Sequence, residues 1–354
     1  MSDMTTVPTA ESTPASHLPP GHPRVPFGKI GVLLLNLGTP DATDYWSMRR
    51  YLKEFLSDER VIEEPKWKWW PILNFIILTV RPSRKGKDYD TIWNKERNEG
   101  PLKTITREQA DGLAARLSGH PNVIVDWAMR YQNPSTESRL EALVKQGCER
   151  ILLVPLYPHY AASTTATACD QAFRALMKMR WQPAVRVAPR YADDPVFIAA
   201  LAGSIRTHMA SLTWEPEKLI VTYHGMPQAY FDKGDPYHCH CQKTTRLLTD
   251  ALGWPKEKII TTFQSKFGND PWIEPATDAT VERFAKEGIK RLAIVAPGFS
   301  ADCLETLEEL DVENREIFMH NGGQDFTYVP ALNASKGGLD TIEAVVRREL
   351  MGWL

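Results

Sequence analysis

The chain has 354 residues, of which 43% are hydrophobic and 24% are charged, and its formal net charge is −2. A chain of this length can bury a real core, either as one large α/β unit or as two domains. The slightly acidic balance argues against nucleic-acid binding, which needs a basic face against phosphate groups. Five cysteines, an odd number without the spacing of a disulfide framework, indicate a reducing compartment, and we predict a cytoplasmic protein.

The first segment of the chain is rich in Thr, Ser and Pro and contains no apolar run of the signal-peptide type. With Arg24 as its single arginine, it also lacks the composition of an organellar targeting peptide. We therefore predict a disordered leader over residues 1–27.

An unusually apolar segment runs from Trp67 to Val80 and has three tryptophans within its first four residues. The cations that flank it or lie within it are Lys66, Lys68, Arg81, Arg84, Lys85 and Lys87. The segment is too short to cross a bilayer, which takes about 20 apolar residues, and Pro71 interrupts it. One interpretation is a buried core helix. We favour an exposed apolar lip over residues 66–89 that rests on an anionic membrane surface, because tryptophans suit an interface.

Short apolar runs rich in Val, Ile and Leu alternate with amphipathic stretches along the chain. The runs that we predict to be strands are Ile30–Leu37, Val123–Tyr131, Ile151–Tyr157, Val185–Pro189, Leu219–Tyr223, Lys258–Phe263, Leu292–Pro297 and Phe326–Val329. The predicted helices include Thr104–Leu117, Thr136–Gln146, Cys169–Met179, Pro195–Met209, Thr280–Glu287 and Leu339–Leu350. This alternation indicates parallel sheet covered on both faces. Eight such units form either one closed barrel or two open sheets, and the long link between Gly38 and Asn122 weakly favours two sheets.

Polar residues follow directly after most of the predicted strands. They include Asn36, Arg130, Tyr131, Tyr157, His159, His224, Gln264, Ser265 and Lys266. In a barrel and in an open sheet alike, ligands bind at the carboxyl ends of parallel strands. The pattern therefore predicts one shared site at these strand ends.

His224 lies directly after the fifth predicted strand and before a turn that contains glycine. A neutral imidazole accepts a proton at cellular pH and can also ligate a metal ion. A single histidine is more often structural, but the position at a strand end favours a role in the site.

The stretch after the seventh strand carries Glu305, Glu309 and Glu313 at intervals of four residues. A regular helix would place these carboxylates on one face, and no lysine lies between Ala301 and Asn314 to neutralise them. Such a stripe can relay protons outward or pass a hydrated cation inward; the alternative is a solvated acidic face. Glu305 is the innermost candidate because it lies nearest to the strand end.

Other polar groups carry weaker signals. The consecutive residues His238–Cys241 cannot all reach one tetrahedral ion, and no distant partner pair is apparent, so incidental loop chemistry is favoured over a structural metal site. Lys266, Arg130 and Arg49 or Arg50 can bind carboxylates, although a solvated cation is the default for each. A glycine-rich phosphate loop is absent from the sequence, which argues against nucleotide use.

Six segments stand out when they are read together: LLLNLGTP, MRY, VPLYPHYAAST, YHGMP with DPY, FQSKFGNDPW and PGFSADCLETLEELDVE. In their order and approximate spacing, from about Lys29 onward, they resemble the ferrochelatases. The resemblance implies a lyase that inserts Fe²⁺ into protoporphyrin IX to form protohaem, and the YHGMP form is similar to the Gram-negative bacterial branch.

The resemblance also implies an α/β fold of two similar Rossmann-like lobes, each a four-stranded parallel sheet flanked by helices, with the active-site cleft between them. We expect lobe 1 to cover residues 28–190 together with the C-terminal helix 338–354. Lobe 2 would cover residues 191–337.

The family's functional residues can be carried over to matching positions. His224 corresponds to the active-site histidine, a proton acceptor or metal ligand, and Glu305 to the catalytic carboxylate facing it across the porphyrin. Glu309 and Glu313 continue an acidic path and complete the expected metal-binding set. The positions that match the porphyrin pocket are Leu37, Arg130, Tyr131, Tyr157, Ser163, Tyr237, Gln264, Ser265, Lys266 and Trp272. Residues 67–89 match the lip through which porphyrin enters, so peripheral attachment at the inner membrane is expected.

The chain departs from other branches of the family at several positions. Leu37 replaces a Met or Tyr over the macrocycle, which argues against axial coordination of the metal from that side. Cys303 stands where the animal enzymes have a second histidine, which argues against iron delivery by that route. Because no cysteine follows Cys303, we expect no [2Fe–2S] cluster of the animal type, and no cofactor besides the substrate iron. Metal binding by Cys239 and Cys241, and the oligomeric state, stay open.

Two other functions compete with iron insertion. A cobalt chelatase that acts on a corrinoid precursor would be separated from it by competition between metals and between tetrapyrroles. A haem or porphyrin carrier without turnover would have no use for the acidic stripe. A metal-binding protein of the exported kind is argued against by the missing signal peptide.

Overall fold

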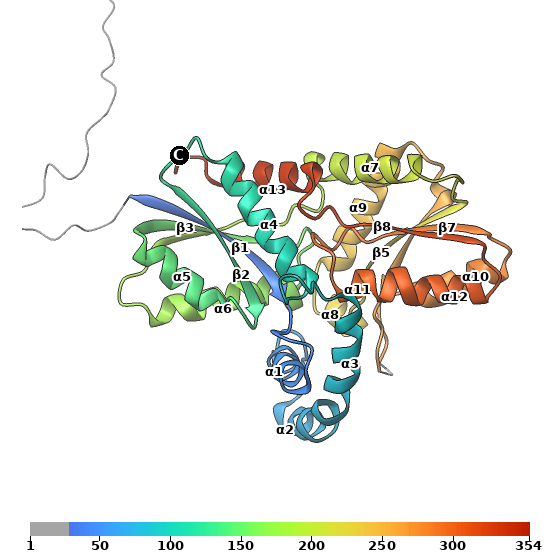
Figure 1. Cartoon of the computed structure of the whole chain (residues 1–354), viewed down its shortest axis with the longest axis horizontal. Helices are drawn as coiled ribbons and strands as arrows, with labels where there is room; N and C mark the ends of the chain where they lie inside the picture. The colour runs from blue at the N-terminus through green and yellow to red at the C-terminus, as the bar shows by residue number, and fades with distance from the viewer. Residues whose placement is uncertain (1–27, 269) are drawn as a thin grey trace, which may run out of the picture.

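The computed structural model describes residues 28–268 and 270–354, which form an α/β molecule with two lobes (Figure 1). The sheet of lobe 1 has the strand order β2-β1-β3-β4 and consists of β1 (Lys29–Gly38), β2 (Val123–Tyr131), β3 (Cys148–Pro155) and β4 (Ala184–Val187). The sheet of lobe 2 has the order β6-β5-β7-β8 and consists of β5 (Lys218–His224), β6 (Ile259–Gln264), β7 (Arg291–Val295) and β8 (Asp325–Val329). All pairings are parallel and the two orders are equivalent, so two similar lobes are confirmed and a closed barrel is excluded. The leader predicted over residues 1–27 lies outside the described residues.

Alternation of apolar side chains gives each sheet two buried faces. In β1, Leu33 and Leu35 join the core beneath one face, whereas Val32 and Leu34 join the core on the other. The helices that flank the two sheets are α4 (Pro101–Arg116), α5 (Thr136–Lys145), α6 (Thr167–Lys178), α7 (Pro195–Ala210), α9 (Tyr237–Leu252), α10 (Thr277–Lys286) and α12 (Asn314–His320). Helices on both faces shield the parallel strands from water, which explains their continuous hydrophobic sequences.

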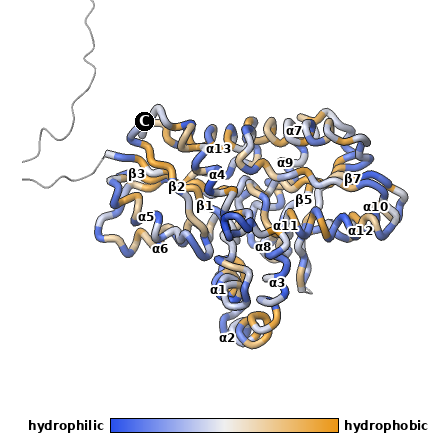
Figure 2. Tube along the Cα trace, viewed as in Figure 1, coloured by the Kyte–Doolittle hydropathy of each residue, from blue (hydrophilic) through white to orange (hydrophobic). Residues whose placement is uncertain are grey.

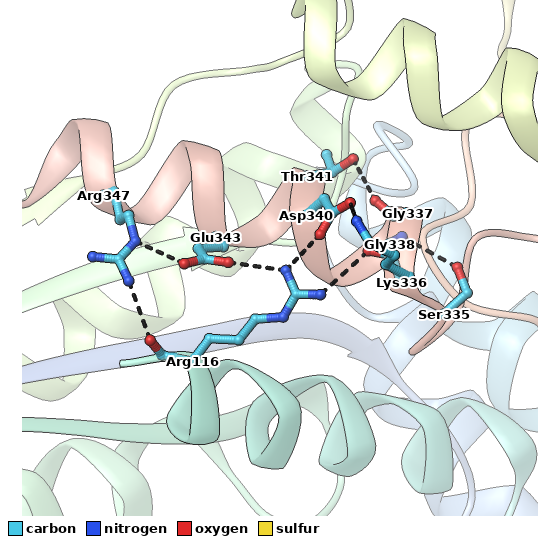
Figure 3. A network of polar contacts seen from close by, with 9 residues as sticks. All are labelled: Arg116, Ser335, Lys336, Gly337, Gly338, Asp340, Thr341, Glu343 and Arg347. Carbon is cyan, nitrogen blue, oxygen red and sulfur yellow. Dashed lines mark hydrogen bonds and ion pairs between the residues drawn. The ribbon is translucent and has the colours of Figure 1, made fainter. Parts of the chain in front are cut away.

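The last helix, α13 (Lys336–Glu349), packs against α4 of lobe 1 and against α7 of lobe 2 (Figure 1). Its buried Ile342 and Val346 belong to one apolar core that contains side chains of both sheets. A polar network borders this core, in which Arg116 of α4 pairs with Asp340 at 2.7 Å and with Glu343 at 2.9 Å (Figure 3). The C-terminal helix therefore connects the two lobes.

A helical lip projects from the lobes between β1 and α4 (Figure 1). It consists of α1 (Tyr45–Leu56), α2 (Lys66–Pro71), the π-helix η2 (Ile72–Ile77) and α3 (Leu78–Ile92). Leu73 and Leu78 are buried within it, but Trp67 is 81% exposed, Phe75 68% and Val80 67%. The buried core helix is therefore wrong for these side chains, and their expected exposure is confirmed, whereas contact with a membrane stays a prediction. Figure 2 shows the apolar stretch beyond α2 at the outer end of the lip.

Within the described residues, no helix combines the length and the apolar composition that crossing a membrane requires.

Candidate active site

A cavity opens at the carboxyl ends of the strands, and residues of both lobes line it. It encloses about 980 Å³, a volume that includes the space opening to solvent. Lobe 1 and its lip contribute Leu37, Tyr51, Phe55, Tyr89 and Tyr157, and lobe 2 contributes His224, Tyr237, Phe299, Cys303 and Glu305. The shared site predicted at the strand ends therefore exists, and its walls are mainly apolar and aromatic.

His224 is the last residue of β5, and its exposed side chain lines the cavity. Its Nδ1 lies 2.7 Å from the carbonyl oxygen of Gly225. A carbonyl can only accept, so Nδ1 carries the proton of this bond, and the neutral ring keeps its lone pair on Nε2. The sharp turn that follows requires glycine, because a Cβ at position 225 would lie 2.7 Å from the carbonyl oxygen of Gln264. The local backbone thus sets the tautomer of the imidazole.

Glu305 lies in the short helix α11 (Leu304–Leu307) and lines the same cavity as His224. The buried Gln264, at the end of β6, donates from Nε2 to the backbone carbonyl of Glu305 at 2.9 Å. The sequence marked Gln264 as a porphyrin contact. The structure places it behind α11, where it holds the backbone of the candidate catalytic carboxylate.

The acidic stretch after α11 is not one regular helix. It continues as the π-helix η5 (Glu309–Glu313), in which the amide of Glu313 donates to the carbonyl of Glu308, five residues earlier, at 2.9 Å. The regular stacking predicted for Glu305, Glu309 and Glu313 on one α-helical face is therefore wrong beyond Leu307. The wider turn brings Glu313 toward Glu308 instead.

Two glutamates of this stretch have raised pKa values. Burial raises the pKa of Glu309 by more than the hydrogen bonds from Ser265 and the nearby His224 lower it. Ser265 donates to Glu309 from its amide at 2.8 Å and from its hydroxyl at 2.6 Å. Burial, and then the neighbouring Glu313 carboxylate, raise the pKa of Glu308 to about 7. The acidic stretch therefore contains carboxyl groups that take up protons more readily than free glutamate does.

Arg130 and Tyr131, both predicted to contact porphyrin, are buried beside the cavity and do not line it. Arg130 forms an ion pair with Asp58 and donates from Nε to the hydroxyl of Thr167 at 2.6 Å. The hydroxyl of Tyr131 donates to the same Asp58 at 2.9 Å. Asp58 follows α1, so this network attaches the root of the lip to the end of β2. Asp58 was not predicted from the sequence, because its role depends on contacts with Arg130 and Tyr131, which lie far from it along the chain.

The remaining predicted pocket residues are distributed around the site. Trp272 packs against Gly225, and Lys266 is exposed and pairs with Glu274 at 3.1 Å. Ser163 lies in the short π-helix η3 (Ala162–Ala166), next to Thr164, which lines the cavity. Of the predicted set, Leu37, Tyr157, Tyr237, His224 and Glu305 line the cavity itself.

Helix α1 of the lip supplies two cavity residues that were not predicted from the sequence, Tyr51 and Phe55. The two residues are four positions apart in the first helix after β1. This spacing could have predicted that they share one face of a helix. Burial, and then the Glu305 carboxylate, raise the pKa of Tyr51, which therefore remains a neutral hydroxyl near that carboxylate.

Neither His159 nor the segment His238–Cys241 adds a group to the proposed chemistry of the site. His159 also lines the cavity, but burial, followed by the influence of His240, lowers its pKa to about 3, so it stays neutral. The residues His238–Cys241 form the first turn of α9 and not a loop, which corrects the sequence-based interpretation.

Across the described part of the chain, no group of three or more His, Cys, Asp or Glu side chains is arranged to hold a metal ion. The metal-binding roles of His224, Glu305, Glu309 and Glu313 stay predictions.

Comparisons with known proteins agree with this architecture. The family model "Ferrochelatase" matches residues 29–350. A ferrochelatase of Agrobacterium fabrum is 61% identical over 343 residues, which cover 97% of this chain and 100% of the relative. Ferrochelatases of Rhizobium meliloti and Nitrobacter hamburgensis are 60% and 57% identical, covering 94% and 95% of this chain and 98% and 99% of the relatives.

Solved structures include one of similar fold. SirB from Bacillus subtilis with Fe³⁺ is similar with a TM-score of 0.55 at 14% identity, over 91% of this chain and 95% of that one. At this identity the likeness supports the two-lobed fold alone. The family match and the sequence identity over nearly the whole length show that the chain belongs to the ferrochelatase family.

Proposed function

We propose that the chain inserts Fe²⁺ into protoporphyrin IX and produces protohaem and two protons, as the last step of haem assembly. One observation carries this proposal: His224 and Glu305 line a single, largely aromatic cavity between the two lobes. A cavity with mainly apolar walls suits a flat macrocycle, and the two polar groups provide a base and a carboxylate where the metal would enter.

Proton removal is the first task of such a site, because two pyrrole N–H bonds must break before the nitrogen lone pairs can bind iron. In our proposal, Nε2 of His224 accepts a pyrrole proton, since Nδ1 is engaged with the carbonyl of Gly225. Glu309 lies near His224, and its raised pKa makes it the next acceptor. Protons would then leave along the acidic stretch toward the exposed Glu313.

Iron is the substrate of this reaction, and its ligands must hold it only transiently. Imidazole nitrogen and carboxylate oxygen are suitable ligands for a ferrous ion. We propose that Glu305, Glu309 and Glu313 pass the hydrated ion toward the porphyrin, and that His224 can be a further ligand through Nε2 only before this nitrogen takes up the pyrrole proton.

The porphyrin itself would be held between Leu37 and Tyr157 of lobe 1 and the lobe 2 wall around Tyr237. A slot that binds the ring out of plane directs the nitrogen lone pairs at the metal, and contacts with the ring edges offset the strain. Distortion of the bound ring is part of this proposal.

We also propose that the lip places the enzyme on the cytoplasmic face of the inner membrane. The supporting observation is the exposure of Trp67, Phe75 and Val80 next to the cationic Arg81 and Arg84. Exposed apolar side chains flanked by cations bind to anionic lipid surfaces through burial and charge together.

The proposal is tested with purified protein, protoporphyrin IX and Fe²⁺ or Zn²⁺ under anaerobic conditions. The visible absorbance bands of the free porphyrin should convert to those of the metalloporphyrin with many turnovers per enzyme. Tight binding of the metalloporphyrin without turnover would indicate a carrier. Preferential metallation of a corrinoid precursor by Co²⁺ in a competition assay would indicate a cobalt chelatase. Either outcome would contradict the proposed function.

A further inference from the structure

Gln109 connects helix α4 of lobe 1 with the loops that build the lobe 2 side of the cavity. Its side chain is completely buried, and Nε2 donates to the carbonyl of Ser300 at 2.9 Å and to the carbonyl of Asn333 at 3.2 Å. Ser300 follows β7 and Asn333 follows β8. Gln109 itself does not line the cavity, so one buried amide of lobe 1 holds two strand-end loops of lobe 2 from behind.

These two loops are joined to the segment that carries Glu305. The amide of Asn333 donates to the carbonyl of Ser300 at 3.1 Å, and its side chain exchanges two hydrogen bonds with Asp302. Asp302 in turn accepts from the hydroxyl of Thr306 at 2.9 Å, next to Glu305 in α11. Asn333 adopts a positive φ of 49°, a conformation that asparagine tolerates better than most residues. A continuous chain of short polar contacts therefore leads from Gln109 to α11.

We propose that Gln109 is a positioning residue for metal insertion: by fixing these loops from the opposite lobe, it sets the position of Glu305 relative to a porphyrin held by lobe 1. The inference rests on the proposed function, because it assigns Gln109 a role in that reaction. Leu37 and Tyr157 belong to lobe 1 and Glu305 to lobe 2, so the reacting geometry depends on how the lobes are held together. A displacement of about 1 Å between reacting groups can reduce a rate by about 10²-fold.

The chain offers a matched control for this position. Arg116 lies on the same helix and also connects lobe 1 to α13 through Asp340 and Glu343 (Figure 3). It is not among the residues that line the cavity. Gln109→Met keeps the side-chain volume but removes both donated hydrogen bonds, and Arg116→Met removes the ion pairs. Both variants should lower Tm, because both lose contacts between lobe 1 and the rest of the molecule.

Steady-state kinetics with Zn²⁺ and protoporphyrin IX distinguish the two variants. For Gln109→Met we expect kcat to fall by about tenfold or more with KM for porphyrin within about twofold of wild type, since Glu305 acts in the chemical step whereas most of the apolar lining, including Leu37 and Tyr157, belongs to lobe 1. For Arg116→Met we expect kcat within about twofold of wild type. Equal kcat values in the two variants, or a loss confined to KM, would overturn the inference.

Gln109→His provides a second test if Gln109→Met does not fold. A neutral imidazole retains one N–H donor at a similar reach, so this variant should keep a larger part of the wild-type kcat than Gln109→Met or, in its absence, Gln109→Ala. A histidine variant no more active than the donor-free variant would contradict the positioning role. If the wild-type chain metallates no porphyrin, the proposed function and this inference both fail; if wild type is active and Gln109→Met keeps its kcat, the inference alone fails.

Discussion

Single residues at the strand ends divide into those that face the cavity and those that hold the cavity residues in place. Arg130 belongs to the second group: its charged side chain is 7% exposed and that of its partner Asp58 is 5% exposed. A buried charge needs a partner, and the Asp58 carboxylate pairs with the guanidinium of Arg130. This guanidinium is therefore not free to bind a carboxylate of the substrate, as the sequence had suggested. Gln264 and Ser265 act similarly, since their hydrogen bonds fix Glu305 and Glu309.

The imidazole of His224 provides the sharpest test at this scale. In His224→Ala the proposed proton acceptor is lost, and we expect kcat for Fe²⁺ or Zn²⁺ insertion to fall by about 10²–10⁴-fold, the usual contribution of a positioned general base. The KM for porphyrin should change little. His320→Ala is the control, because His320 is exposed on α12 and its Nδ1 contacts only the carbonyl of Glu316. A wild-type kcat in His224→Ala would remove the assigned role.

Glu308 makes stability depend on pH. Its pKa is about 7 in the folded chain, above the ordinary 4.5. Between these two pH values, the folded state holds a proton on Glu308 that the unfolded state has released. This contribution to stability is fully present below about pH 4.5 and is lost as the pH rises through 7. Glu308→Gln should therefore raise Tm at pH 8 clearly more than at pH 5, as measured by circular dichroism. Glu316→Gln, at an exposed position, should show no such difference, and an equal Tm shift of Glu308→Gln at both pH values would refute the assignment.

Among the secondary-structure elements, the π-helical turns η5 and η2 modify what the sequence pattern suggests. η5 replaces the regular spacing of the acidic residues by a wider turn, and η2 lies at the outer end of the lip. In contrast to these turns, α1 is a regular α-helix, and its apolar stripe places Tyr51 and Phe55 at the cavity. The lip thus combines an inner face that completes the cavity wall with an outer face that remains in solvent.

Membrane attachment should depend on the outer face of the lip. We expect Phe75→Ser combined with Val80→Ser to weaken binding to vesicles of anionic phospholipid by about tenfold or more, because both side chains are largely exposed and would bury apolar area in the lipid. Cosedimentation with the vesicles measures the effect, and Tm should stay close to that of wild type. Met177→Ser is the control, since Met177 is 79% exposed on α6, away from the lip. Equal vesicle binding by all three proteins would contradict the proposed attachment.

The two lobes of the whole molecule share one apolar core through α13. Lobes with separate cores would open independently, whereas here side chains of α4, α7 and α13 pack together. The C-terminal helix contacts both lobes. Because residues of both lobes line the cavity, a shift of one lobe relative to the other changes the geometry of the cavity.

This shared core predicts a single unfolding transition. Ile342 of α13 is 4% exposed, and Ile342→Ala should lower the free energy of unfolding by about 2–5 kcal/mol, the usual cost of truncating a buried isoleucine. In calorimetry the whole transition should move to lower temperature without splitting. Lys336→Ala, at a side chain that is 86% exposed, should leave the transition nearly unchanged. Two separated transitions in either variant would show that the lobes unfold independently.

Local patterns in the sequence predicted the eight strands found in the described residues, because a buried parallel strand leaves a continuous apolar run whatever its neighbours are. They also predicted that His224 and Glu305 share the site, since His224 ends a strand and Glu305 lies in the stretch that follows another strand. The choice of two sheets over a barrel, the partner of Arg130 and the link from Gln109 to Ser300 were decided by the tertiary structure. These features depend on contacts between segments far apart in the chain, for which the local sequence carries no periodic signal. The π-helical turn in the acidic stretch belongs to the same group, because its widened spacing depends on what packs around it.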